Sequence, residues 1–172
     1  AKRPSAERGH ARRVLTCLAL GLAPAVAVGA GKGLPDVTNP DQFQCIGRNR
    51  FSGMVNVPVE KQGENVSWSY AAFFVDPVLG TPIIVYGPRF PELAPVMRSF
   101  IRRHECQHAN GVSDEIAANC AALAQMRAQG LTAQQEAHLR RWHLAEGQLD
   151  PQYGGSGAAF WERTVHCAAA AR

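Results

Sequence analysis

The stretch from His104 to His108 constrains this chain more than any other, because it reads H-E-x-x-H. On a helix, side chains four residues apart project from one face, about a turn from each other. His104 and His108 can therefore direct their imidazoles at a single metal ion, with Glu105 beside them to polarise a bound water. The motif predicts a zinc site, on condition that the stretch is helical and that a third ligand follows it.

The residues around the motif predict two helices. Apolar side chains recur at spacings of three and four before His104, Pro95 suits a helix start, and Gly111 suits a stop. A second helical pattern begins at Glu115, with Ser113 placed as its N-cap. The motif is thus expected on a helix that a short turn joins to another helix.

Two carboxylates, Asp114 and Glu115, compete for the place of the third ligand. A catalytic zinc usually takes three protein side chains and leaves its fourth position to water. Asn119 lies one helical turn after Glu115, from where its side chain can hydrogen-bond one of the ligands.

These residues resemble the gluzincin group of zincin metallopeptidases, in which H-E-x-x-H is followed by a helix carrying E-x-x-x-D. Here the last position of that pattern is Asn119. The resemblance implies that His104, His108 and Glu115 hold one Zn²⁺ ion. It also implies that Glu105 is the catalytic base in the hydrolysis of a peptide or protein substrate.

A rival interpretation takes Gly111 and Asp114 as part of a metzincin-like pattern, with Asp114 as third ligand. Metzincins need a methionine turn beneath the metal, whereas the one later methionine, Met126, sits in an alanine-rich helical run. Glu115 is therefore preferred, although its link to His108 is shorter than in familiar gluzincins. An alternative from another class is a non-catalytic envelope protein with a structural or degenerate zinc site.

The N-terminal part has the pattern of an export signal. A basic start precedes an apolar run over Val14–Val28, which contains a small-residue cleavage pattern. We expect a signal peptide at 1–27, a flexible linker at 28–42 and one zincin-like domain at 43–172. The expected location is periplasmic or secreted.

The predicted signal also changes the meaning of the net charge. The chain carries +4 in total, and residues 1–27 hold five basic side chains against one acidic side chain. The remainder is formally neutral, so we expect no nucleic-acid partner and, after cleavage, no stable membrane anchor.

Export to an oxidising compartment would allow the cysteines to form disulfides. Without Cys17, the expected mature chain keeps four: Cys45, Cys106, Cys120 and Cys167. An even number in an oxidising compartment predicts disulfides, for which three pairings are possible. We favour Cys106 with Cys120, as a brace between the two ligand-bearing helices, and Cys45 with Cys167.

The fold class expected is α+β, with a small antiparallel sheet followed by a mostly helical half. Phe51–Val59 alternates apolar with small or polar residues, Lys61–Glu64 is typical of a turn, and Val66–Val75 is rich in aromatic and β-branched residues, so an antiparallel hairpin is predicted. A short strand is predicted at Thr81–Tyr86. The resemblance implies that this strand pairs with an extended substrate, and the alternative is an ordinary buried strand.

The last third of the chain predicts two more helices. Thr132 begins a capping box before one of them, and Ser156 is placed as N-cap of the other. His138 and His143 are weaker candidates for an alternative ligand or an oxyanion donor, and Tyr153 is a weaker candidate for a transition-state donor.

Overall fold

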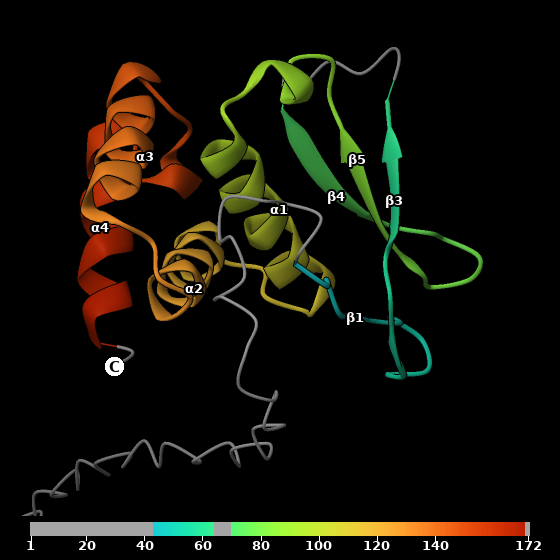
Figure 1. The fold of residues 1–172 in the computed structure, drawn as a ribbon. Helices are drawn as coiled ribbons and strands as arrows, with labels where there is room; N and C mark the ends of the chain where they lie inside the picture. The colour runs from blue at the N-terminus through green and yellow to red at the C-terminus, as the bar shows by residue number, and fades with distance from the viewer. Residues whose placement is uncertain (1–42, 64–69, 171–172) are drawn as a thin grey trace, which may run out of the picture. The chain divides into compact units, whose positions relative to one another are not determined.

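The structure, a computed structural model, describes residues 43–63 and 70–170, so the predicted signal and linker lie outside it. The described chain is α+β, as expected, and Figure 1 shows α1 between the sheet and the other helices. The elements are β1 (Gly47–Arg48), β2 (Val55–Asn56), β3 (Val59–Gln62), β4 (Ala71–Val75), β5 (Pro82–Tyr86), η2 (Phe90–Glu92), α1 (Pro95–Ala109), α2 (Glu115–Ala128), α3 (Ala133–Ala145), η3 (Pro151–Tyr153) and α4 (Gly157–Ala170).

The two helices predicted around the motif are present. Helix α1 begins at Pro95, where a missing N–H costs nothing, and the chain turns at Gly111, whose φ is 99°. The N-cap predicted for α2 was wrong by one residue. Asp114, not Ser113, caps this helix, and its carboxylate accepts the N–H of Ala117 at 2.7 Å. A carboxylate there also favours the positive end of the helix dipole.

The two later helices begin as predicted. Thr132 and Gln135 form the capping box of α3, and the Ser156 hydroxyl accepts a backbone N–H from the first turn of α4. Helix α4 starts directly against α3, because a Cβ added at Gly157 would lie 1.8 Å from the carbonyl oxygen of His143. The glycine allows this close approach.

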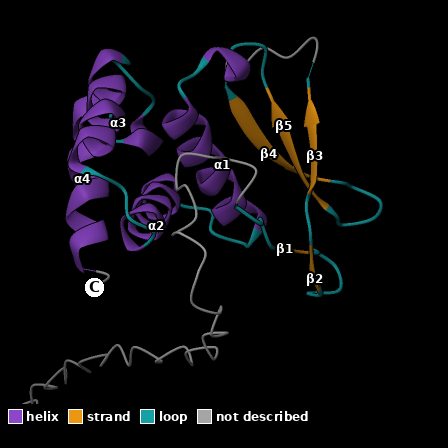
Figure 2. Cartoon of the chain, viewed as in Figure 1, coloured by secondary structure: helices purple, strands orange, loops and turns teal. Residues whose placement is uncertain are grey.

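The sheet differs from the prediction. Its strand order is β3-β5-β4, with β4 antiparallel and β3 parallel to β5, so the small sheet is mixed and β3 and β4 do not form a hairpin (Figure 2). Strand β5 is the most buried strand and takes the central position, where both of its edges are covered. Strands β1 and β2 pair separately as a two-stranded ribbon.

Helix α1 separates two apolar clusters. One joins its Met97 and Phe100 to apolar side chains of α2, α3 and α4, among them Leu123. The other joins its Cys106 and Ala109 to Cys45 and to β5. Because α1 is buried on both sides, the motif that it carries is held between the sheet and the helices.

The structure pairs the cysteines differently from the favoured prediction. Cys45 is bonded to Cys106, and Cys120 to Cys167. Cys106 does face away from His104, as its helical position required, but the segment on that side of α1 is the one carrying Cys45, not α2. Cys120 points instead toward α4.

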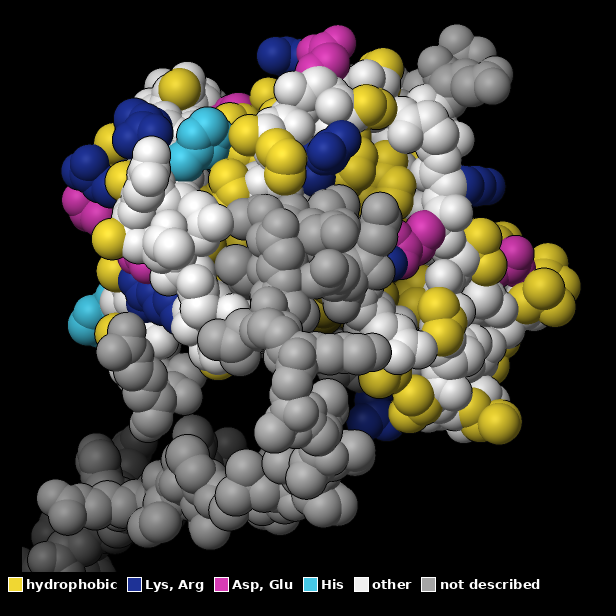
Figure 3. All heavy atoms as spheres, in the orientation of Figure 1, with side chains coloured by type: hydrophobic (Ala, Val, Ile, Leu, Met, Phe, Trp, Pro, Cys, Tyr) yellow, Lys and Arg dark blue, Asp and Glu magenta, His cyan; other side chains and the backbone are white. Residues whose placement is uncertain are grey.

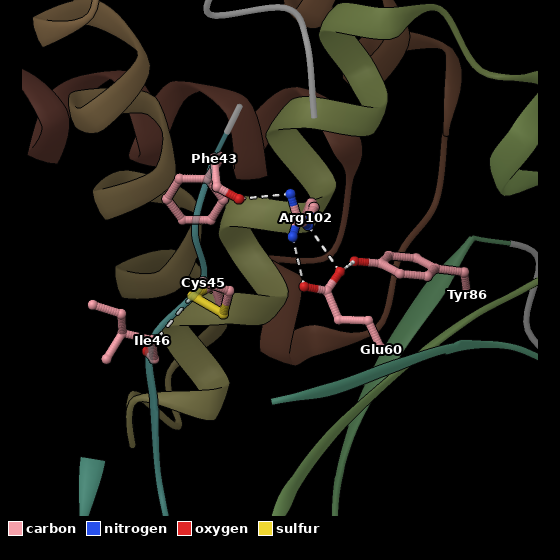
Figure 4. The surroundings of a disulfide bond; sticks show 7 residues. Phe43, Cys45, Ile46, Glu60, Tyr86 and Arg102 are labelled. Atoms are coloured by element: carbon pink, nitrogen blue, oxygen red, sulfur yellow. Dashed lines mark hydrogen bonds and ion pairs between the residues drawn. A yellow bond between two sulfur atoms is a disulfide. The ribbon is translucent and has the colours of Figure 1, made fainter. Parts of the chain in front are cut away.

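Further polar contacts hold the sheet to the side of α1 that carries the first disulfide (Figure 4). The Arg102 guanidinium forms two hydrogen bonds to the Glu60 carboxylate, at 2.7 and 2.8 Å, and donates to the carbonyl of Phe43 at 2.6 Å. The Tyr86 hydroxyl also donates to Glu60. Burial alone raises the pKa of Glu60, but the hydrogen bonds from Arg102 and Tyr86 outweigh it and lower that pKa.

The sheet part exposes large apolar side chains, which Figure 3 shows over the region of β1 and the β4–β5 turn. Met54 is 69% exposed and Val78 80% exposed. In the part of the chain that the structure describes, no helix has both the length and the apolar character needed to cross a bilayer.

Candidate metal centre

Three possible ligand atoms meet where α1 and α2 face each other. The Nε2 atoms of His104 and His108 lie 3.0 Å apart, and an oxygen of Glu115 lies 3.1 and 3.3 Å from them. Tetrahedral ligands of one zinc ion stand about 3.4 Å from each other, given metal–ligand distances of about 2.0–2.2 Å. The spacing of the three atoms therefore fits one small metal ion, and this group can hold a metal.

The other ring nitrogen of each histidine, Nδ1, already forms a hydrogen bond. Nδ1–H of His104 donates to the Asn119 side-chain oxygen at 3.0 Å, and Nδ1–H of His108 donates to the carbonyl of Val112 at 2.6 Å. These acceptors require the proton on Nδ1, which leaves the lone pair of each Nε2 directed at the centre. Both rings are thus held in the tautomer that a metal needs.

Asn119 connects His104 to the other helices, and its position within reach of a candidate ligand was predicted. Its amide nitrogen faces Nε2 of His143 at 3.3 Å and donates to the Thr164 hydroxyl at 3.1 Å. His143 and Thr164 then donate to backbone carbonyls of their own helices, at 2.8 Å each. Asn119 is 2% exposed, so this network is internal and links α1, α2, α3 and α4 through His104.

The two carboxylates that compete for the third ligand position have different surroundings. Glu115 faces both histidines, whereas the Asp114 carboxylate caps α2. Burial alone raises the pKa of Glu115, but the adjacent imidazoles of His104 and His108 outweigh it and lower the pKa to about 2. The structure therefore brings Glu115, and not Asp114, to the two histidines.

Glu105 is buried beside this group, with 7% of its surface exposed. Burial raises its pKa most, the charge of Glu115 raises it further, and the neighbouring histidines act in the opposite direction. A carboxylate whose pKa is raised holds a proton more readily than a free one, which suits it to accept and pass on a proton. Its place next to the ligand group follows from its position after His104 on α1.

Two cavities meet at this centre. A cleft of about 810 Å³ is lined by β4, by α1 with the turn after it, and by the β1–β2 loop. A smaller cavity of about 260 Å³ has an aromatic lining, including Tyr70, Trp142 and Phe160. His104, Glu105 and Tyr153 line both, so His104 and Glu105 lie where the cavities join, while His108 and Glu115 line the larger cleft.

The strand beside the cleft is β4, not the predicted β5, which is covered on both edges. The carbonyl of Tyr70 accepts from Gly87 and the N–H of Asp76 donates to Thr81, so even-numbered residues of β4 face β5. In an antiparallel pair the intervening residues point their backbone groups the other way. Those of Ala71, Phe73 and Val75 are therefore directed to the outer edge, and all three residues line the cleft.

The weaker candidates fall in different places. His143 is 2% exposed and contacts Asn119, the hydrogen-bond partner of His104, and neither His143 nor His138 belongs to the group of three possible ligands. Tyr153 lines both cavities. Burial and the charges of Glu115 and Glu105 raise its pKa.

Sequence reasoning missed Thr164 and the arginines of the cleft, Arg48 and Arg50. Thr164 lies 45 residues from Asn119, and no local pattern joins the two. The arginines follow Cys45 closely in the sequence, but only the folded ribbon brings them to the cleft. Compared with protein-family models, with curated proteins and with solved structures, the chain matches none.

Proposed function

We propose that this protein is an exported zinc-dependent metallopeptidase. The observation that carries the proposal is the convergence of His104, His108 and Glu115 beside the buried carboxylate of Glu105, at a point that an open cleft reaches. Two imidazoles and one carboxylate are a ligand set typical of catalytic zinc. A cleft at the ligand group favours a catalytic over a structural site.

Each residue of the centre has a separate task in this mechanism. The ligand group would hold zinc, which as a Lewis acid lowers the pKa of water and polarises a carbonyl. Glu105 accepts the proton of the attacking water and passes it to the leaving amine. Asn119 and Val112 keep His104 and His108 in the required tautomer.

The cavities suggest how a peptide lies at the centre. An extended chain can pair with the outer edge of β4 through the backbone groups of Ala71, Phe73 and Val75. The aromatic cavity accommodates one large apolar side chain next to the scissile bond. Tyr153, which lines both cavities, can donate its hydroxyl to the developing oxyanion.

The location is supported by the two disulfides, which are compatible with an extracellular or periplasmic protein. The predicted signal and its cleavage remain part of the proposal. N-terminal sequencing of the protein recovered from outside the cytoplasm tests them.

The ligands are tested by metal content. Glu115→Ala should remove most of the zinc that the purified chain retains, whereas Asp114→Ala should keep it and lose only the helix cap. The Asp114 variant is the matched control, because it removes the adjacent carboxylate. The opposite ranking would establish Asp114 as the third ligand.

The base is tested by separating metal binding from turnover. Glu105→Gln should retain zinc and lose cleavage of a fluorogenic peptide by at least about a hundredfold, since Gln cannot accept the proton. A Gln variant that remains active would rule out this mechanism. A wild-type protein that binds zinc and cleaves no peptide would favour the structural alternative.

A further inference from the structure

The cleft is charged differently along its length. Two arginines, Arg48 and Arg50, line the end formed by the β1–β2 ribbon. Among the described residues that line the cleft, the acidic ones are Glu105 and Glu115, which belong to the centre itself. The rest of the lining is neutral apart from the two histidines, so the arginine end carries an excess of positive charge.

The arginine end is held in place by backbone and side-chain contacts. Nε of Arg48 donates to the Asn110 side chain at 3.2 Å, just beyond the end of α1. The backbone N–H of Arg50 donates to Gly80 at 2.8 Å, and the Asn49 amide donates to Leu79 at 2.8 Å. The loop is thus fastened to the end of α1 and to the β4–β5 turn, while the two arginines remain exposed.

Asp76 is the acidic residue closest in sequence to Leu79 and Gly80, and its carboxylate already accepts hydrogen bonds. The Asp76 carboxylate accepts the backbone N–H groups of Val78 and Leu79, each at 2.8 Å. These hydrogen bonds lower its pKa. Asp76 does not line the cleft, so a substrate carboxylate would meet the arginines without an acidic neighbour in the lining.

The direction of β4 determines which end of a bound peptide lies at the arginines. Val75 ends β4 beside the turn that Arg50 contacts, while Ala71 begins it at the aromatic cavity. Antiparallel pairing is the more stable arrangement. A peptide that pairs antiparallel with β4 therefore places its N-terminal residues at the arginines and its C-terminal residues at the aromatic cavity.

We propose that Arg48 and Arg50 select peptides with carboxylate side chains on the N-terminal side of the scissile bond. The inference rests on the proposed peptidase function and names its substrate class. Strand β4 spans about 14 Å, or four residues, so the selected positions are those two to four residues before the bond. Charge pairs at an exposed site strengthen binding severalfold each and weaken with salt.

The test uses three fluorogenic peptides of equal length. One carries Asp and Glu before an Ala–Phe bond, one carries Lys at the same places, and one carries the acidic residues after the bond. We measure kcat/KM on the zinc-loaded full chain, and binding to Glu105→Gln by fluorescence anisotropy at low and high salt. The variants are Arg48→Glu with Arg50→Glu, and as control Arg140→Glu with Arg141→Glu, which changes the net charge equally on α3.

Wild type should cleave the first peptide in preference to the second by about tenfold at low salt, and Glu105→Gln should show the same preference in binding. The variant of the cleft should reverse the preference, and the α3 control should keep it. Equal values for the three peptides would overturn the inference and leave the peptidase function intact, and preference for the third would overturn the direction of binding. If no peptide is cleaved, the proposed function fails, while binding to Glu105→Gln still decides the charge selection.

Discussion

The two histidines of the centre are held in contrasting ways. His104 donates to Asn119, a buried residue that itself contacts His143 on α3 and Thr164 on α4. His108 donates to the carbonyl of Val112, four residues further along the chain, in the turn that follows its own helix. One side of the centre therefore depends on the packing of four helices, and the other on a local turn.

The difference shows where the centre is vulnerable. A change anywhere in the helical core that moves Asn119 is expected to disturb His104, whereas His108 should respond only to changes in the turn at 110–113. Supporting hydrogen bonds of this kind typically change metal affinity by 10–100-fold. Four predictions test this contrast.

The largest effect is expected from the disulfide that lies beside Asn119. Cys120→Ser with Cys167→Ser should lower the free energy of unfolding by about 4 kcal/mol in the chain-entropy model, for a sequence separation of 47. The same variant should bind zinc more weakly, because this bond and the Asn119–Thr164 contact join the same two helices. Urea unfolding and competition with a zinc chelator measure the two effects.

The other disulfide is the matched control. Cys45→Ser with Cys106→Ser opens a separation of 61, so its cost in unfolding free energy should be similar, about 4 kcal/mol. Its effect on zinc affinity should be smaller, since it leaves the contacts of Asn119 intact. Equal losses of zinc affinity in the two variants would contradict the contrast.

Asn119→Leu is expected to have the next largest effect. It removes the acceptor of His104 and leaves polar atoms of His143 and Thr164 unpaired in the core, at a cost of about 3 kcal/mol in unfolding free energy. Zinc affinity should fall 10–100-fold. Asn119→Asp keeps an acceptor for His104 and should retain more zinc, so a Leu variant that binds zinc as tightly as wild type would refute the role of Asn119.

Lowering the pH should destabilise the His104 side of the centre, which depends on the packing of the helices. Burial lowers the pKa of His143 to about 4, with its hydrogen bond to Leu139 opposing the shift. His143 therefore binds a proton more readily in the unfolded chain than in the folded one. Its contribution to the free energy of unfolding is complete above about pH 6.5 and is lost as the pH falls toward 4. Metal-free protein should lose about 2 kcal/mol of unfolding free energy between pH 7.5 and 5 from this group.

His143→Gln is the control for the acid effect. Glutamine does not titrate, so the part of the pH dependence that belongs to His143 should disappear from the urea unfolding curves. A variant with an unchanged pH profile would assign the acid sensitivity to other groups.

The smallest effect is expected on the turn side. Gly111 has φ 99° and open space where a Cβ would be, so Gly111→Ala should cost about 1 kcal/mol of backbone strain without a clash. Because the turn carries Val112, zinc affinity should fall by less than tenfold. Gly130→Ala, with φ 94° and equally open space at the end of α2, should cost the same stability and leave zinc binding unchanged.

Sequence alone determined the helical half of the molecule and most of its centre. The bounds of α1, the capping box at Thr132, and the placement of His104, His108 and Glu105 on one helix follow from interactions within four residues. Asn119 was found for the same reason, because it lies one turn after Glu115. These features depend on hydrogen bonds and helical spacing between residues close in sequence, so they can be predicted without knowing the tertiary structure.

Only the tertiary structure decided which distant segments meet. Alternation of side chains predicts a strand but not the strand that pairs with it. In the structure β5 lies between β3 and β4, and the predicted hairpin was wrong. Cys106 was placed on the correct side of α1, yet its partner is 61 residues away and depends on the segment that packs there. The contacts of Asn119 with His143 and Thr164, and the approach of Arg48 to the cleft, likewise exist only once the helices and the ribbon are packed.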